Sequence, residues 1–236
     1  MKINPETRLL LILGAVVLLG GGGMVMLNNN PFSKPPPPIP TPKPLVWDEP
    51  TFESTLAKAR HIRGDAKAAR FTLIEFGDLE CPSCRYAYNN LLVKVDKEFP
   101  IRFAFIHNPL AMHTHAIAAA AATEAADKQG KFWPMFDALY TNVDAPLNQD
   151  VFDATAKKLG LDEKRFQADC QDRAVQASVE QDSHIGIDVH ISQTPTFVLR
   201  DEKSHQIYLV TGGRTLDQKI SALTGTPTVM PPDPAK

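Results

Sequence analysis

Two apolar runs of strand length lie close together in the first half of the chain. The segments FTLIEFG (71–77) and IRFAFIH (101–107) are nearly continuous in apolar and aromatic residues. Such runs are typical of strands that are covered on both faces of a sheet. Between them a helix is predicted from Pro82 to about Phe99, because proline is tolerated in a first helical turn. The three elements together predict a βαβ unit.

The middle of the chain has the pattern of helices almost throughout. Glycine is common just after a helix, and glycines follow several of these helical patterns. The predicted helices cover, in order, residues 113–130, 131–140, 150–159 and 162–185. We therefore expect a helical block between the first strands and the end of the chain.

Strands return after the helical block. The segments TPTFVLR (194–200) and IYLV (207–210) are predicted strands, separated by a polar turn, and Thr215 is expected to cap a final helix to about Leu223. A short amphipathic helix with Thr51 as its cap is predicted over 51–63. The order βαβ, helical block, ββα predicts an α/β fold with one main domain over 51–223 and a helical insertion over about 110–188.

The flanking segments have a different composition. Leu9 to Leu27 is an uncharged apolar run preceded by Lys2 and Arg8, so residues 1–30 are expected to be a membrane anchor or a signal peptide. Either one would direct the rest of the chain out of the cytoplasm. Residues 31–50 are proline-rich and are expected to form an extended linker, and residues 224–236 are expected to be a disordered tail.

Composition narrows the possible functions. The chain has 236 residues, 43% of them hydrophobic, which is enough for a substantial core. The formal net charge is −2 and the basic residues are scattered, so a nucleic-acid partner is not expected. There are 3 cysteines, too few and of the wrong parity for a disulfide framework. Any cysteine chemistry must therefore come from one pair.

That pair is Cys81 and Cys84, at the start of the helix predicted after the first strand. A zinc site needs four ligands, and the only further cysteine is Cys170 on another predicted helix. A structural disulfide across so short a loop would gain little from loop closure. Soft thiolate ligands would also suit Cu(I). A reactive dithiol is the reading we favour, with the structural disulfide, zinc and copper kept as alternatives.

The position of the pair suggests a division of roles. A thiolate at Cys81 would face the free backbone N–H groups of Ser83 and Cys84, and the helix dipole favours negative charge there. Cys81 is then the exposed nucleophile and Cys84 the shielded resolving thiol. The dipole accounts for about one pKa unit. Because Asp78 and Glu80 would oppose a thiolate, we predict a Cys81 pKa that is lowered only modestly.

Glu75 is the one carboxylate inside the first buried strand, six residues before Cys81. An unpaired charge there would be costly, so a protonatable glutamate beneath the pair could take and return the proton of Cys84. The alternatives are a glutamate that faces solvent and one that is paired with a lysine.

These residues together resemble the DsbA-like branch of the thioredoxin superfamily. The resemblance covers about residues 50–223 and is carried by the acid-x5-C-P-x-C pattern from Glu75 to Cys84, by IRFAFIHNPL with His113 and Ala116, by QGKFW at 129–133 and by TPTF at 194–197. It implies a thioredoxin fold with a central mixed sheet, interrupted by a helical insertion. No organic cofactor or metal is implied.

The resemblance also implies the geometry of the substrate site. The Thr194–Pro195 bond is expected to be cis and to face the cysteines, leaving the Thr194 backbone free to pair with an extended substrate segment. Pro82, Ser83, Thr194 and Pro195 are thus the expected substrate-binding residues. Ser83 stands where strongly oxidising members carry histidine. His113 is expected to pack at a helix start rather than to take part in catalysis, and Cys170 to be a small buried hydrophobic residue.

The function implied is that of an extracytoplasmic thiol:disulfide oxidoreductase, tethered to the cytoplasmic membrane or periplasmic. It would introduce disulfides into reduced or misoxidised protein substrates through Cys81 and Cys84 and be reoxidised by a membrane redox partner. A disulfide reductase or isomerase that uses the same pair, and a copper-binding thiol module, are the alternatives.

Overall fold

The computed structural model describes residues 46–142 and 146–230. The apolar run from Leu9 to Leu27, most of the proline-rich linker and residues 231–236 lie outside the described residues. Among the described residues, no helix combines the length and apolar character needed to cross a bilayer.

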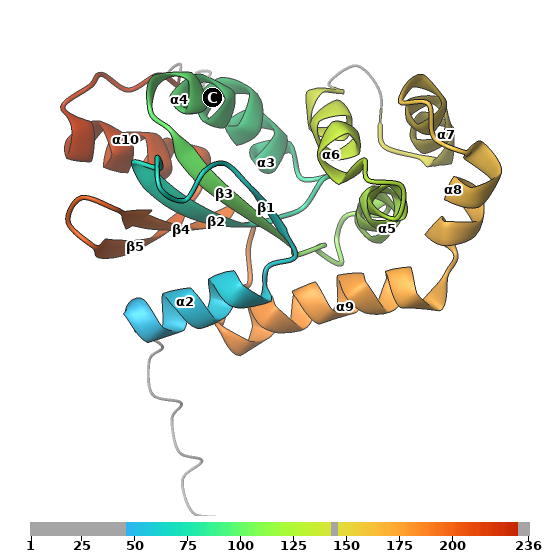
Figure 1. The fold of residues 1–236 in the computed structure, drawn as a ribbon, viewed down its shortest axis with the longest axis horizontal. Helices are drawn as coiled ribbons and strands as arrows, with labels where there is room; N and C mark the ends of the chain where they lie inside the picture. The colour runs from blue at the N-terminus through green and yellow to red at the C-terminus, as the bar shows by residue number, and fades with distance from the viewer. Residues whose placement is uncertain (1–45, 143–145, 231–236) are drawn as a thin grey trace, which may run out of the picture. The chain divides into compact units, whose positions relative to one another are not determined.

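The described part of the chain forms a mixed sheet of five strands in the order β1-β3-β2-β4-β5 (Figure 1). Strands β2 and β3 pair in parallel and the other neighbours are antiparallel. The strands are β1 (His61–Arg63), β2 (Phe71–Gly77), β3 (Ile101–His107), β4 (Thr196–Asp201) and β5 (Gln206–Thr211). The βαβ unit and the ββα ending predicted from the pattern are confirmed.

Helices cover both faces of the sheet (Figure 1). One face carries α2 (Glu49–Lys58) and α9 (Arg173–Asp188), which pack on the β2 residues Ile74 and Phe76. The other face carries α3 (Pro82–Ala87), a π-helical turn η1 (Tyr88–Leu92), α4 (Val93–Glu98) and α10 (Gly213–Thr224). Because side chains alternate along a strand, Leu73 and Glu75 of β2 point to this second face.

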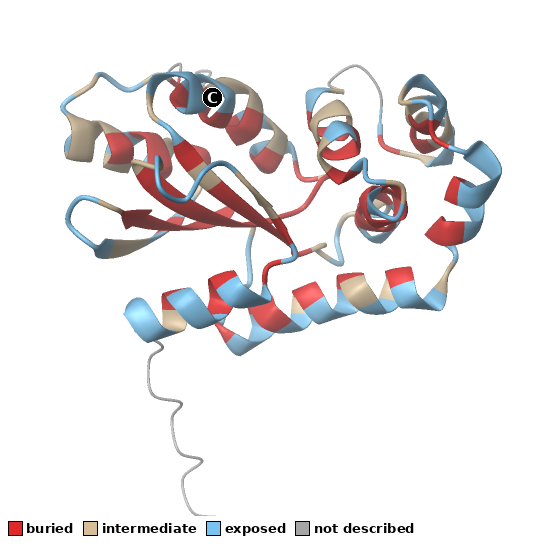
Figure 2. Cartoon of the chain, viewed as in Figure 1, coloured by how far each residue is buried: buried red, intermediate tan, exposed pale blue. Residues whose placement is uncertain are grey.

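The helical insertion lies beside the sheet. Its helices are α5 (Ala116–Asp127), α6 (Phe132–Thr141), α7 (Gln149–Lys158), α8 (Glu163–Cys170) and α9. Buried residues of α5 to α8 join those of the second sheet face in one core, and Figure 2 shows the buried residues on these helices. Aromatic side chains of α6, among them Phe136 and Tyr140, make the junction with Phe105 of β3.

Several predicted helix boundaries were wrong. Asp48, not Thr51, caps α2, and its carboxylate accepts the Thr51 backbone N–H at 2.9 Å. The helix predicted over 51–63 ends at Lys58, because His61–Arg63 pairs with β3 as a short strand. The helix α10 begins at Gly213 rather than after Thr215.

The long helix predicted over 162–185 is two helices. It breaks after Cys170, and the Asp172 carboxylate caps α9 by accepting the Ala174 N–H at 3.0 Å. Gly186 does not end a helix but lies inside α9. A Cβ at that position would come within 3.2 Å of the Asn108 side chain, so glycine allows α9 to pack closely on the sheet.

Part of the predicted tail packs on the fold. The backbone N–H groups of Val229 and Met230 donate to the buried carboxylate of Asp217, at 3.0 and 2.8 Å. Met230 is buried against the second sheet face. The chain is therefore ordered up to at least residue 230, beyond the predicted domain end at 223.

Candidate active site

The two cysteines lie at the start of α3, directly after the turn that follows β2. Cys81 is the N-cap residue and Pro82 occupies the first helical position, where its missing N–H costs nothing. Pro82 and Ser83 are exposed, whereas both cysteines are buried, Cys81 with 5% and Cys84 with 0% of its surface accessible. The expectation of an exposed Cys81 was thus wrong, because the loop containing Thr194 covers it.

That loop contains the cis bond that the resemblance implied. The Thr194–Pro195 peptide is cis, and the Cys81 sulfur lies 3.6 Å from the Thr194 carbonyl oxygen, to which it donates when it is protonated. The Pro195 carbonyl accepts the Gly212 N–H at 2.9 Å, which ties the loop to the start of α10. The structure therefore brings Pro82, Ser83, Thr194 and Pro195 together around the sulfur of Cys81.

Hydrogen-bond donors gather around the Cys81 sulfur and lower its pKa to about 5. The largest contribution is the thiol of Cys84, which outweighs the opposing effect of burial. Thr194 and the backbone N–H groups of Cys84 and Ser83 contribute further. The helix N–H donors predicted from the sequence are present. The prediction that the pKa of Cys81 is lowered only modestly was wrong, because the Cys84 thiol lowers it more than the helix start does.

The acidic residues beside the pair are themselves paired with histidines. The Asp78 carboxylate contacts His113 Nδ1 at 2.7 Å and accepts the Leu110 N–H at 2.9 Å. Glu80 likewise contacts His115 Nδ1 at 3.1 Å and accepts its backbone N–H. Both acidic residues that were predicted to oppose a thiolate are therefore paired with imidazoles. The sequence analysis placed His113 at a helix start and did not assign His115.

His113 lies closer to the chemistry than helix-start packing implies. Burial disfavours its charged form, but Asp78 and the negative charges of Cys81 and Glu80 raise the pKa of His113 above its ordinary value. His113 was among the residues that carry the resemblance, but it was expected only to pack at a helix start, with no contact to Asp78. Only the fold places this imidazole beside Asp78, in the turn that leads to Cys81.

Cys84 has the opposite environment. Burial raises its pKa well above the ordinary value, and the negative charges of Cys81 and Glu75 raise it further. At neutral pH the pair therefore holds a thiolate at Cys81 and a protonated thiol at Cys84. This asymmetry is what the predicted roles of nucleophile for Cys81 and resolving thiol for Cys84 require.

Glu75 lies on β2 beneath the pair and is fully buried. Burial raises its pKa to about 8. The Tyr140 hydroxyl donates to Glu75 Oε1 at 3.3 Å, and this hydrogen bond partly opposes the rise in pKa. Its second oxygen has no hydrogen-bond partner among the described residues, and within them Glu75 forms no ion pair. The alternatives of a solvent-facing or lysine-paired glutamate are wrong, and Glu75 can exchange a proton near neutral pH.

Metal-ligating groups are also present away from the cysteines. Two sets of side chains in the described residues place ligand atoms close together, His61 with Glu124 and Asp127, and His107 with Glu124 and Asp182. Arg60 already forms ion pairs with Glu124 and Asp182, at 2.5 and 3.0 Å. The charge of this cluster is thus compensated by the protein itself.

Cys170 lies in the buried core of the insertion, as predicted. Burial raises its pKa to about 12, so it is a neutral thiol at physiological pH. It takes no part in the site around Cys81.

Comparison with known proteins agrees with this geometry. A family model described as Thioredoxin matches residues 56–216. The chain belongs to the thioredoxin family. Among solved structures, DsbA2 of Pseudomonas aeruginosa is 26% identical, with a TM-score of 0.54 over 71% of this chain and 95% of that chain. A thioredoxin-like oxidoreductase from Silicibacter pomeroyi is also 26% identical, with a TM-score of 0.59 over 72% of this chain and 94% of that one.

The DsbA-like branch is the part of the family that these structures represent. BdbD of Bacillus subtilis shares the fold at 21% identity, with a TM-score of 0.59 over 72% of this chain and 93% of that chain. This thioredoxin-family chain is thus a DsbA-like member, with a thioredoxin-like mixed sheet and a helical insertion.

Curated relatives add a different kind of likeness. A protein named Na(+)/H(+) antiporter NhaA from Herminiimonas arsenicoxydans is 35% identical over 151 residues, which are 63% of this chain and 23% of that protein. An antiporter of the same name from Salinispora tropica is 34% identical over 149 residues, 63% of this chain and 22% of that protein. The matched part of the chain spans less than a quarter of the length of these relatives.

Proposed function

We propose that this thioredoxin-family chain is an extracytoplasmic thiol:disulfide oxidoreductase that introduces disulfides into protein substrates through Cys81 and Cys84. The observation that carries the proposal is the pKa of Cys81, about 5, next to a buried Cys84 whose pKa is raised. A stabilised Cys81 thiolate favours the reduced form, and a pair whose reduced form is stabilised is a strong oxidant.

The reaction begins with the Cys81–Cys84 disulfide. A substrate thiolate attacks the Cys81 sulfur, so that a mixed disulfide forms at Cys81 and Cys84 leaves as a thiolate. Glu75, neutral below its pKa of about 8, gives its proton to Cys84. A second substrate thiolate then attacks the substrate sulfur of the mixed disulfide and releases Cys81 as a thiolate, which the surrounding donors stabilise.

The substrate contacts follow from the loop opposite the cysteines. An extended substrate segment could pair with the Thr194 backbone, and Pro82 and Ser83 offer exposed surface on the other side of the sulfur. The substrates we propose are reduced or misoxidised proteins, whose unfolded segments can adopt the extended conformation that such pairing needs.

The location we propose is the outer side of the cytoplasmic membrane. The apolar run from Leu9 to Leu27 and the name of the curated relatives, a membrane antiporter, both favour a position at a membrane. A membrane redox partner would accept the two electrons of the reduced pair and restore the disulfide.

The direct test is the oxidation of a reduced, unfolded protein by stoichiometric disulfide-form enzyme. Wild type should oxidise it, and Cys81→Ser should abolish the reaction. Cys170→Ser is the matched control and should behave as wild type, because its thiol is buried elsewhere and neutral. Activity that survives in Cys81→Ser would contradict the proposal.

Redox equilibration separates the alternatives. Incubation with defined ratios of reduced to oxidised glutathione should give a reduction potential for the Cys81–Cys84 pair well above that of thioredoxin, which is about −270 mV. A value close to that of thioredoxin would replace the oxidase with a reductase. Tight, stoichiometric Cu(I) binding without oxidation of protein thiols would replace it with a copper module.

Clients and the redox partner can be captured in cells. With Cys84→Ala the mixed disulfide at Cys81 has no resolving thiol, so the attached proteins remain bound through Cys81. Cys81→Ala with Cys84 intact is the matched control and should capture none, because the buried Cys84 thiol is inaccessible.

A further inference from the structure

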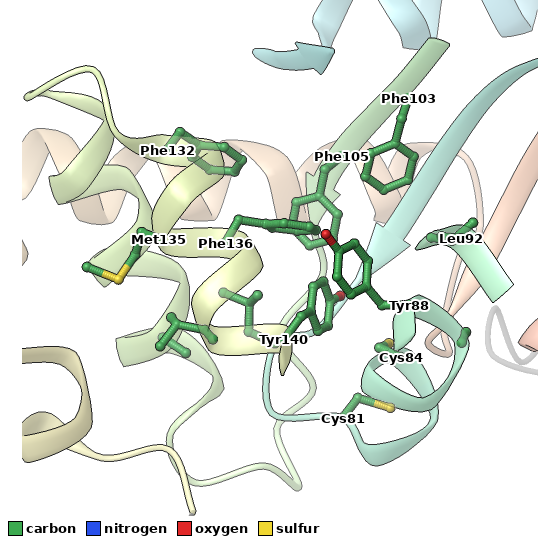
Figure 3. Close-up of a cluster of buried hydrophobic side chains, with 14 of the residues drawn as sticks. Cys81, Cys84, Tyr88, Leu92, Phe103, Phe105, Phe132, Met135, Phe136 and Tyr140 are labelled. Atoms are coloured by element: carbon green, nitrogen blue, oxygen red, sulfur yellow. The ribbon is translucent and has the colours of Figure 1, made fainter. Parts of the chain in front are cut away.

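Tyr140 connects the helical insertion to the buried carboxyl beneath the cysteines. It lies on α6, is fully buried, and donates its hydroxyl to Glu75 Oε1 at 3.3 Å. In Figure 3 its ring lies beside Tyr88 and close to Cys84, where α6 meets the active-site helix. Among the described residues this hydroxyl is the only hydrogen-bond partner of Glu75's carboxyl oxygens.

The surrounding residues hold Tyr140 in a fixed position. Its ring stacks on Tyr88 with centroids 5.1 Å apart, and Phe136 packs edge-on at 4.6 Å. Asn89 Nδ2 donates to the Tyr140 carbonyl at 2.9 Å. Tyr88 and Asn89 belong to the π-helical turn η1, so the irregular turn of the active-site helix is the part that contacts Tyr140 from two directions.

Gly77 leaves room for the contact between the two side chains. A Cβ at this position would lie 2.8 Å from the Tyr140 hydroxyl and 2.9 Å from Glu75 Oε1. The same Cβ would lie closer still to Phe105 Cε2, so any larger residue at the end of β2 would displace at least one of these three side chains. The glycine, the tyrosine and the glutamate form one packed unit.

We propose that Tyr140 is a positioning residue that orients the Glu75 carboxyl and stabilises its charged form, so that Glu75 can both give a proton to Cys84 and take it back. The proposal rests on the proposed function and names the insertion as part of the proton relay. The hydroxyl acts only through Glu75 and does not touch the substrate.

The proton steps balance in both directions. When a substrate thiolate opens the disulfide, Cys84 leaves as a thiolate, neutral Glu75 protonates it, and the Tyr140 hydroxyl donates to the resulting carboxylate. During reoxidation a disulfide of the partner protein is attacked by the Cys81 thiolate, and the partner releases one thiolate. Glu75 then takes the Cys84 proton, and the Cys84 thiolate attacks Cys81 and releases the second partner thiolate.

Other charges also face Glu75, but none in hydrogen-bond contact within the described residues. The negative charge of Cys81, the N-cap residue of α3, opposes ionisation of Glu75, and so does a charge on Cys84 within α3. Arg63 on β1 favours ionisation of Glu75 from a distance. Asp78 acts on Tyr140 from the turn before α3. Burial raises the pKa of Tyr140 well above its ordinary value, so its hydroxyl remains a proton-bearing donor throughout.

The test compares Tyr140→Phe with wild type, since phenylalanine keeps the ring and its stacking. The protonation of Glu75 is followed directly by carboxyl NMR or infrared titration of the reduced protein. We expect its midpoint to rise by about one pH unit, the effect of losing one hydrogen bond to a charged group. Tyr88→Phe removes a neighbouring, partly buried hydroxyl that contacts Arg63 and Asp137 but not Glu75, and should shift the midpoint far less than Tyr140→Phe does.

A kinetic measurement reads the same shift at the cysteines. Cys81 is loaded with glutathione, and the rate at which Cys84 releases it is measured against pH. In Tyr140→Phe the rise of this rate should move to higher pH by the same unit, about tenfold slower release below the midpoint. An unchanged Glu75 midpoint in Tyr140→Phe would overturn the inference.

The two proposals can fail separately. Wild type that releases glutathione but does not oxidise protein thiols would contradict the proposed function, while the Glu75 titration would still decide the role of Tyr140. Wild-type kinetics in Glu75→Gln would overturn the relay itself. An unshifted profile in Tyr140→Phe, with Glu75→Gln impaired, would overturn the role of Tyr140 alone.

Discussion

At neutral pH two buried glutamates differ in charge: Glu75 is mostly protonated, and Glu124 is ionised. Glu75 on β2 and Glu124 on α5 are almost completely inaccessible, at 0% and 4%. Burial raises the pKa of Glu75 to about 8, and one tyrosine hydroxyl is its hydrogen-bond partner in the described residues. Burial also disfavours the charge of Glu124, but hydrogen bonds and charges from His107 and His61 lower its pKa far below the ordinary value.

The difference lies in the partners. Glu124 contacts His61 Nε2 at 2.7 Å, His107 Nε2 at 3.3 Å and Arg60 at 2.5 Å. This cluster connects α5 of the insertion to β1, β3 and Arg60, which lies between α2 and β1 (Figure 1). A compensated buried charge serves to join elements, whereas the weakly partnered carboxyl under Cys84 keeps a pKa near neutrality, where proton exchange is possible.

The largest expected effect is the loss of Glu124. Glu124→Gln leaves Arg60 and the histidines without their shared carboxylate, and should destabilise the protein by about 3 kcal/mol at pH 7. Chemical denaturation measures the change. The exposed Glu180 provides the control, because Glu180→Gln should change stability by less than about 0.5 kcal/mol.

The pH dependence of this penalty follows from the lowered pKa. Glu124 in the unfolded chain takes up a proton near 4.5, whereas in the folded protein it stays ionised to much lower pH. The stabilisation is therefore present above pH 4.5 and is lost as the pH falls further below it. A Glu124→Gln penalty that stayed constant down to acid pH would contradict the compensated-charge account.

Glu75→Gln is expected to act in the opposite direction. Between pH 4.5 and about 8 the carboxyl ionises in the unfolded chain but not in the folded protein, so ionisation favours unfolding throughout this window. Removing it should stabilise the reduced protein at pH 7 by about 2 kcal/mol, after the buried amide's own cost. Below pH 4.5 the gain should be lost and only the cost of the buried amide should remain. If the stability difference between wild type and Glu75→Gln were the same at pH 7 and at pH 4, the pKa of Glu75 would not be raised in the folded protein.

A third variant sharpens the same contrast at the sulfur of Cys81. Its thiolate is held by donors in the way that Glu124 is, and the Cys84 thiol is the largest of them. Cys84→Ala should raise the pKa of Cys81 by about one unit, the effect of one hydrogen bond to a charge. Thiolate absorbance at 240 nm against pH gives the value. No shift would assign the low pKa to Thr194 and the helix start instead.

The smallest effect is expected at His113. Because its imidazole is paired with Asp78 at 2.7 Å, the two together present little net charge to Cys81. His113→Gln should raise the pKa of Cys81 by less than about half a unit. A shift as large as that of Cys84→Ala would make His113 a main stabiliser of the thiolate.

Local sequence signals were sufficient for the framework. The apolar runs at 71–77 and 101–107 predicted the buried strands, because continuous apolar side chains have few alternatives to a covered sheet. Pro82 after Cys81 marked the helix start and with it the N–H groups of Ser83 and Cys84 near the sulfur. The cis geometry at Thr194–Pro195 was predicted only from the resemblance, since only a few per cent of X–Pro bonds in folded proteins are cis.

The boundaries that were missed depend on distant residues. His61–Arg63 continues a helical pattern along the chain, but it becomes a strand because β3 offers it an edge to pair with. Residues after 223 look disordered by composition, yet Asp217 binds the backbone at residues 229 and 230. In both places a contact with residues distant in the sequence overrides the local conformational preference, and composition and periodicity do not reveal such contacts.

The sequence by itself determined where the two sulfurs lie relative to a helix start and which carboxyl sits in the strand before them, because backbone propensities act over a few neighbouring residues. Only the tertiary structure decided the charge state of each group. Tyr140 reaches Glu75 across 65 residues of chain, and His61 reaches Glu124 across 63. Protonation in a protein interior depends on which donors and charges lie within a few ångströms, and folding alone brings those groups together.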